Sequence, residues 1–251
     1  MISPKQLLVT LLLSGILISC STHVCGKCGN QSDPLLHHAF NNEDQLKRYN
    51  LIRDSIASHR LHLLSSLNSG NPQHQILKKA SLYLTEKITA RLFPFWYGTS
   101  WDYNGTTERP GEGGIACGYF VSTVLKHAGF KIEKVKLSQQ PASNIIKTLC
   151  KKESIKVFGN NREREFLRYM NAQPNGIYLL GLDFHVGYLH KTDSKLHFIH
   201  SLGGTGVIRE KASESEPIQL SNVHFVGSLS GNDDLMRRWL TGKVITTRGV
   251  Q

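Results

Sequence analysis

The spacing of hydrophobic residues changes along the chain, and this change most constrains the fold. In residues 43–92 apolar side chains recur at steps of three to five, which predicts two amphipathic helices separated at residues 69–72. The last third instead carries short apolar runs separated by Gly, Asp and Asn, which predict strands at 176–182, 185–190, 195–201 and 224–229. Helices followed by an antiparallel sheet predict the α+β class.

The middle of the chain is predicted to mix both kinds of element. A helix is expected to start at Cys117 and run to about residue 128, and further helices are expected near 142–151 and 162–172. A strand is expected at 131–137. We therefore expect a helical region at 43–92, a domain at 93–230 and a C-terminal tail at 231–251.

The N-terminus has the features of an export signal. Lys5 precedes an apolar stretch that is too short to span a bilayer, so residues 1–19 are predicted to be a signal peptide. The stretch ends in Leu-Ile-Ser-Cys, which resembles a bacterial lipobox with Cys20 as the acylated residue; an ordinary cleaved signal is the alternative. Residues 20–42 would be the lipidated cysteine and a polar tether. We expect a periplasmic or cell-surface protein, anchored to a bacterial membrane.

The five cysteines fall into three groups. Cys20 is the expected lipid site. Cys25 and Cys28 are close enough in sequence to form a local disulfide in an oxidising compartment. Cys117 and Cys150 remain as free thiols.

Composition narrows the classes of partner. The formal charge of +11 suits an anionic partner, but the chain has no Arg/Lys-rich arm and no stripe of alternating basic and aromatic residues. Nucleic acid is therefore the least favoured partner. No cofactor or metal is predicted, since the conceivable zinc set lies in the tether: Cys25, Cys28, His37 and His38.

Cys117 is the candidate nucleophile. It follows two glycines at the point where a loop is predicted to become a helix. Free backbone N–H groups and the positive end of the helix dipole favour a thiolate there, and the N–H of Cys117 is a natural oxyanion donor. The alternative is a small core residue at the start of an ordinary helix.

Two of the twelve histidines are placed to act with Cys117. Strand side chains alternate between faces, so His197 and His200 should point in opposite directions, which disfavours a metal site. His185 and His200, on neighbouring strands, can meet on a shared face. We expect His185 to form an ion pair with the thiolate and later to protonate the leaving amine. His200 would fix the tautomer of His185.

Residues 94–129 and 176–201 resemble the NlpC-type cell-wall cysteine peptidases. The likeness rests on an aromatic Pro-Phe-Trp-Tyr-Gly-Thr segment, the Cys-Gly-Tyr-Phe-Val helix start, and a His-Val-Gly strand followed by a Phe-Ile-His strand. It implies a papain-like fold and hydrolysis of amide bonds in peptidoglycan stem peptides. It also implies a triad of Cys117, His185 and His200.

The chain departs from that family around the nucleophile. The family's Asp-Cys-Ser-Gly is replaced by Ala116-Cys117-Gly118-Tyr119, which predicts an altered preference for the substrate. Phe95 replaces the family's tyrosine, so Tyr97 and Gly118 are the candidates for oxyanion or substrate contacts. The alternatives are a non-catalytic module that binds cell wall or protein, and an amidase or acyltransferase with another substrate.

Overall fold

The computed structural model describes residues 42–160 and 162–249. These residues belong to one structural unit. The predictions for the signal peptide, for Cys20, for the Cys25–Cys28 disulfide and for nearly all of the tether lie outside the described residues. Within them, no helix is both long and apolar enough to cross a membrane.

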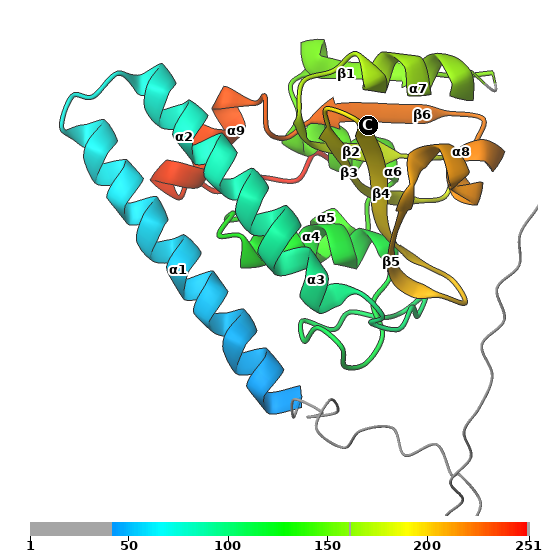
Figure 1. Ribbon diagram of the computed structural model, residues 1–251, viewed down its shortest axis with the longest axis horizontal. Helices are drawn as coiled ribbons and strands as arrows, with labels where there is room; N and C mark the ends of the chain where they lie inside the picture. The colour runs from blue at the N-terminus through cyan, green and yellow to red at the C-terminus, as the bar shows by residue number, and fades with distance from the viewer. Residues whose placement is uncertain (1–41, 161, 250–251) are drawn as a thin grey trace, which may run out of the picture. The chain divides into compact units, whose positions relative to one another are not determined.

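The two predicted N-terminal helices are present as a long hairpin (Figure 1). Helix α1 spans Asn42–Asn68 and α2 spans Gln73–Glu86, with Gly70 at a φ of 83° in the turn between them. The second helix continues through a π-helical turn, η1 (Lys87–Leu92), into the short helix α3 (Phe93–Trp96). The apolar spacing therefore located both helices correctly.

A six-stranded sheet, entirely antiparallel, forms the centre of the fold in the order β1-β6-β2-β3-β4-β5. The strands are β1 (Ile155–Phe158), β2 (Gly176–Gly181), β3 (Val186–Thr192), β4 (Lys195–Leu202), β5 (Gly206–Lys211) and β6 (His224–Ser228). The four predicted strands correspond to β2, β3, β4 and β6. The two missed strands, β1 and β5, are the edges of the sheet, and half of each is charged or exposed.

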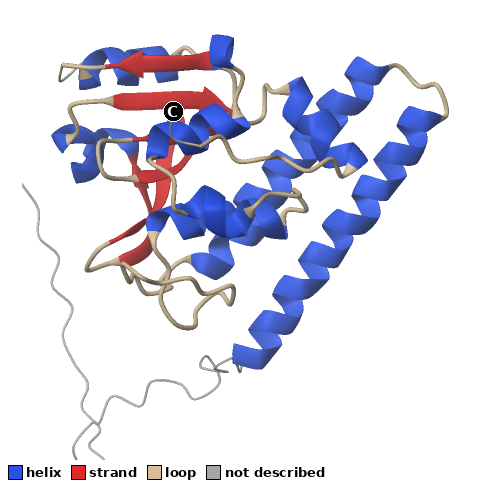
Figure 2. Cartoon of the chain, turned by 180° about the vertical axis from the view of Figure 1, so that it is seen from behind, coloured by secondary structure: helices blue, strands red, loops and turns tan. Residues whose placement is uncertain are grey.

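The remaining helices cover both faces of this sheet (Figure 2). They are α4 (Cys117–His127), α5 (Lys134–Ser138), α6 (Ala142–Leu149), α7 (Glu163–Asn171), α8 (Glu216–Leu220) and α9 (Asp233–Thr241), with 3₁₀ turns η2 (Lys152–Ser154) and η3 (Ala212–Glu214). The strand expected at 131–137 was wrong. Only Ile132 pairs there, in an isolated bridge to Ile245, and α5 follows at once.

Two hydrophobic cores lie on the two sides of the sheet. The larger includes residues of α1, α2, α4, α6 and α9, and the smaller joins the sheet to α7 and α8. Tyr49 from α1 and Trp239 from α9 are both buried in the larger core. The structure thus does not separate residues 43–92 from 93–230, and much of the expected tail is the core helix α9.

The outer edge of β5 is occupied by the loop that precedes α4. The N–H of Gly98 donates to the carbonyl of Val207 (2.9 Å), and the N–H of Val207 donates to the carbonyl of Thr99 (2.9 Å). Gly206 lacks a side chain where one would collide with the Thr99 carbonyl. The loop therefore covers this edge of the sheet at the start of β5.

A buried tyrosine connects α1 to the rest of the fold. The hydroxyl of Tyr49 lies 2.9 Å from Nδ1 of His127 in α4 and accepts a hydrogen bond from Nε1 of Trp96, also at 2.9 Å. All three side chains are buried. The Tyr49 hydroxyl, Nε1 of Trp96 and Nδ1 of His127 therefore satisfy one another away from water.

We predict that Tyr49→Phe destabilises the protein. The variant leaves Nε1 of Trp96 and Nδ1 of His127 buried without this partner, which should lower the free energy of unfolding by about 1–3 kcal/mol. Urea denaturation measures the change. Tyr83→Phe is the matched control, since it removes only an exposed bond to the carbonyl of Ser55. Equal effects of the two variants would contradict the prediction.

Candidate active site

Helix α4 begins at Cys117, as the sequence predicted. The residue before it, Ala116, is extended and provides no side-chain cap, so the first-turn N–H groups are not capped from that position. Gly118 packs against α5, where any side chain would collide with the carbonyl oxygen of Ser138. Packing therefore requires glycine directly after Cys117.

Two buried hydroxyls hold the start of α4 against the sheet. The hydroxyl of Tyr188 in β3 donates to the carbonyl of Val121 at 2.6 Å. The hydroxyl of Ser201 in β4 donates to the carbonyl of Ile115 at 2.7 Å. Together these bonds fix the residues on either side of Cys117. The thiol itself lies beside the backbone N–H of Val186, the first residue of β3.

His185 and His200 meet, as the strand geometry predicted. Nε2 of His185 lies 2.8 Å from Nδ1 of His200, and the rings are nearly perpendicular. Gly187 makes the contact possible, since a Cβ there would come within 2.7 Å of both the Cβ of His200 and the ring of Phe198. Phe198 stacks on His200 with ring centroids 4.1 Å apart. His197 is bonded elsewhere, to Arg209.

A further member of this group, Glu210, was not predicted from the sequence. Its carboxylate Oε1 lies 3.0 Å from Nε2 of His200. Glu210 belongs to β5, opposite Phe198, and therefore lies on the same face as His200. Recognising residues 195–211 as a β-hairpin would have placed Glu210 there. The hairpin was not recognised, because β5 was not predicted.

The three side chains define one arrangement of protons. A carboxylate only accepts hydrogen bonds, so Nε2 of His200 carries a proton toward Glu210. In neutral His200 the other nitrogen, Nδ1, then accepts a bond from the protonated Nε2 of His185. The remaining nitrogen of His185, Nδ1, is consequently the unprotonated one. This is the form required of a base.

Burial disfavours the charged forms of the thiol and of both imidazoles at this site. It raises the pKa of the Cys117 thiol, and the N–H groups of Val186, Gly118 and Cys117 itself only partly offset the rise. Burial also lowers the pKa of His185 and of His200, to about 3 each. These pKa shifts favour a neutral thiol and a neutral imidazole at pH 7, whereas the sequence analysis expected a thiolate ion pair.

Two adjoining pockets meet at Cys117 and His185. The smaller, about 360 Å³, extends past Gln140 and Pro141 to Asp183. The larger, about 640 Å³, extends along the loop that contains Trp101 and Tyr103. Both pockets are lined by the thiol and by the base, so a single bound molecule can reach both groups. We call the two pockets together the cleft.

Of the two residues predicted to contact the oxyanion or the substrate, one lines the cleft and the other does not. Gly118 lines both pockets. Tyr97 is not among the described residues that line them; it is half-buried, which raises its pKa, and it lies near Arg209. In the described part of the chain no cluster of three His, Cys, Asp or Glu side chains could hold a metal ion. Cys150 is buried against Gly227, outside the cleft.

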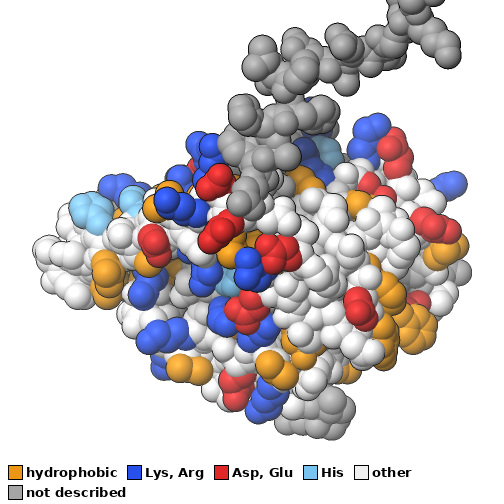
Figure 3. Space-filling model, turned by 90° about the horizontal axis from the view of Figure 1, so that it is seen from below, with side chains coloured by type: hydrophobic (Ala, Val, Ile, Leu, Met, Phe, Trp, Pro, Cys, Tyr) orange, Lys and Arg blue, Asp and Glu red, His pale blue; other side chains and the backbone are white. Residues whose placement is uncertain are grey.

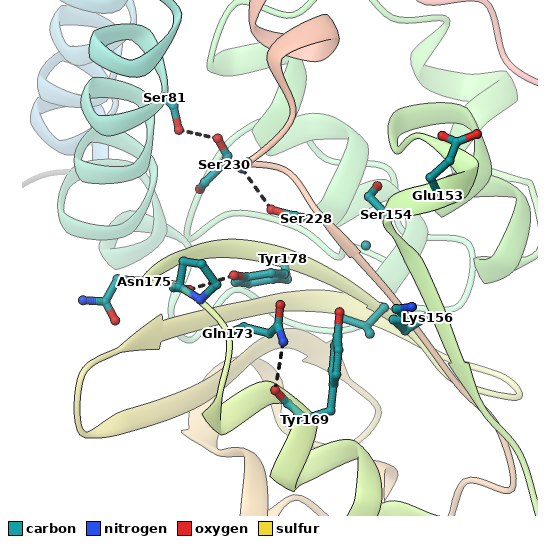
Figure 4. Close-up of a pocket in the computed structure, with 14 residues that line it drawn as sticks. Ser81, Glu153, Ser154, Lys156, Tyr169, Gln173, Asn175, Tyr178, Ser228 and Ser230 are labelled. Carbon is teal, nitrogen blue, oxygen red and sulfur yellow. Dashed lines mark hydrogen bonds between the residues drawn. The ribbon is translucent and has the colours of Figure 1, made fainter. Parts of the chain in front are cut away.

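A further pocket, of about 320 Å³, lies near the start of β2, whereas Asp183 and His185 follow the end of that strand (Figure 4). Several of its polar groups already bond to neighbouring protein atoms. Ser81 donates to the carbonyl of Ser230, and Tyr178 donates to that of Pro174. The described residues that line it include no cysteine or histidine, so they offer neither the thiol nor the imidazole of the cleft.

Comparison with protein-family models, curated proteins and solved structures found no match. The resemblance to NlpC-type peptidases therefore remains a prediction from the sequence.

The proton arrangement predicts a specific effect of Glu210. In Glu210→Ala the proton of His200 is no longer held on Nε2, so the tautomers of both His200 and His185 should become mixed. ¹⁵N NMR of histidine-labelled protein measures which ring nitrogen is protonated. Glu214→Ala is the matched control, because Glu214 pairs with exposed Lys211. Unchanged tautomers in Glu210→Ala would refute the arrangement.

Proposed function

We propose that the protein is an exported thiol hydrolase of papain-like fold that cleaves an amide bond in peptidoglycan stem peptides. The observation that carries this proposal is one cleft lined by Cys117 and His185, with His185 bonded to His200 and His200 to Glu210. A nucleophile, a base and a group that orients the base are what acyl transfer through a thiol requires.

The reaction proceeds through an acyl-enzyme. Sγ of Cys117 attacks the carbonyl carbon as its proton moves to Nδ1 of His185. The imidazolium then gives this proton to the leaving nitrogen, the C–N bond breaks and a thioester remains. Water attacks the thioester, His185 takes a proton from the water and returns it to the thiol, and the acyl group leaves as a carboxylic acid.

His200 and Glu210 act through His185. When His185 becomes an imidazolium, its Nε2–H still donates to His200, and the negative charge of Glu210 stabilises the positive charge beyond it. The N–H of Cys117 is the oxyanion donor that the site offers at the helix start. Because Tyr97 lies outside the cleft, we do not assign it a role in the reaction.

The peptidoglycan substrate rests on two sequence features. One is the resemblance to cell-wall peptidases, and the other is the export signal that would bring the enzyme to the wall. Replacement of the family's Asp and Ser by Ala116 and Gly118 favours a bond other than the family's usual one. A non-wall amide or acyl substrate for the same chemistry is the corresponding alternative.

A second candidate function is a binding module without turnover. The raised pKa of Cys117 and the lowered pKa of His185 favour it, because neither group is charged in the resting protein. In the hydrolase, by contrast, substrate binding and attack drive the proton transfer. The hydrolase would cleave an amide bond of its ligand, and the binding module would leave the ligand intact.

The decisive experiment is to incubate the full chain with purified peptidoglycan and to identify released fragments by mass spectrometry. We expect fragments with the native protein and none with Cys117→Ala. Cys150→Ala, which removes the other described cysteine, should retain release. Glu210→Ala should lower the rate by about 10- to 100-fold. Binding without release would support the module, and release from a non-wall amide alone would support the alternative substrate.

The neutral resting pair predicts the pH dependence of alkylation. Because burial raises the pKa of Cys117, its reaction with iodoacetamide should be slow at pH 7 and should rise about tenfold per pH unit toward pH 9. Mass spectrometry of the peptide containing Cys117 measures the rate separately from the other cysteines. A reactive plateau between pH 5 and 7 would instead reveal a thiolate–imidazolium pair.

A further inference from the structure

The exposed aromatic side chains of the described residues gather in one place. They are Trp101, Tyr103 and Phe184, with exposed fractions of 38%, 79% and 98%. All three line the larger pocket of the cleft. Phe184 directly precedes His185, while the other two come from the loop before α4. We call these three side chains the aromatic rim. Large apolar side chains left in water beside a pocket indicate a binding surface.

The loop that carries Trp101 and Tyr103 is held in place before any ligand binds. Gly105 and Gly114 lie so close to neighbouring atoms of the loop that neither position has room for a side chain. Backbone hydrogen bonds from Gly105 to Asp102 and from Ala116 to Gly105, both 2.9 Å, close the loop on itself. The indole of Trp101 lies over Gly203 in the β4–β5 turn, where a Cβ would be 3.8 Å from the ring. A preorganised surface loses little entropy on binding.

The larger pocket is also free of charged side chains. Among the described residues that line it there is no lysine, arginine, aspartate or glutamate. The polar groups it offers are neutral, including the amides of Asn104 and Gln139 and the hydroxyl of Thr106. This contrasts with the chain's formal charge of +11 and with the face in Figure 3, where basic and acidic side chains are interspersed.

We propose that the aromatic rim is a saccharide subsite that binds a neutral N-acetylhexosamine ring next to the scissile amide. Aromatic rings stack on the C–H faces of a sugar, while side-chain amides and hydroxyls bond its hydroxyl and acetamido groups. A charged stretch of stem peptide would find no counter-charge in this pocket. An acyl chain would offer no polar partner to the amide of Asn104, whereas that of Gln139 already donates to the hydroxyl of Tyr119.

The inference rests on the proposed function, and it narrows the substrate. With the sugar on the rim and the thiol in the same pocket, the cleaved amide lies close to the glycan rather than far along the stem. Asp183, in the smaller pocket, is the acidic group on the other side of Cys117. The preferred substrate is thus a peptide still attached to its sugar.

Tryptophan fluorescence can test the subsite directly. Of the three tryptophans, Trp96 and Trp239 are buried and Trp101 is exposed. Chitotetraose added to the full chain should shift the emission to shorter wavelength and protect it from acrylamide quenching, and Trp101→Phe should abolish both effects. No change at millimolar chitotetraose would overturn the proposal. So would protection by a fatty acid but not by the saccharide.

Variants of the rim provide the second measurement. Tyr103→Ala and Phe184→Ala should each raise the Kd for chitotetraose about tenfold. Leu220→Ala, which removes an exposed apolar side chain on α8, is the matched control and should leave it unchanged. In Cys117→Ala protein, muramyl dipeptide should bind at least about tenfold more tightly than the same dipeptide without its sugar. Equal affinities would contradict the inference.

These results separate the two proposals. Saccharide binding without fragment release from peptidoglycan would retain the subsite and reject the hydrolase. Fragment release with no saccharide binding, and with equal rates for substrates with and without sugar, would retain the hydrolase and reject the subsite.

Discussion

The buried hydrogen bonds from Tyr188 and Ser201 to the backbone around Cys117 are the contacts on which the site depends. They join the second turn of α4 and the residue two positions before Cys117 to two neighbouring strands, so Cys117 is positioned by the sheet as well as by its own helix. Because the acceptors are main-chain carbonyls inside the core, the bonds are costly to break. The thiol is thereby held beside the start of β3, the strand that His185 precedes.

The site has the hydrogen-bonded arrangement that was expected, but its thiol and imidazoles are uncharged. A helix start alone favours a thiolate, but the depth of burial outweighs it for Cys117 and keeps His185 neutral. What remains is a directed chain of hydrogen bonds ending at Glu210. This chain leaves Nδ1 of His185 without a proton, while burial favours the uncharged forms of the thiol and of both imidazoles.

Much of the fold and the core of the site could be predicted from the sequence. The spacing of apolar residues alone located the two long helices and four strands. The placement of His185 and His200 on neighbouring strands correctly predicted that their side chains meet. The edge strand β5 escaped because half of it is charged, and Glu210 was missed with it. Residues 131–137 were misassigned because seven residues do not distinguish a strand from a short helix. The pKa of Cys117 could not be anticipated, since burial depends on packing.

The loop that covers the start of the outer edge of β5 affects self-association. Its bonds to Val207 occupy backbone groups that a strand from another molecule would otherwise use. Within the described residues the other edge of the sheet is β1, a four-residue strand that pairs with β6 alone and carries exposed Lys156. A short edge strand with a charged side chain is a poor template for intermolecular pairing. Any dimer that did extend the sheet there would form at β1, the edge opposite β5.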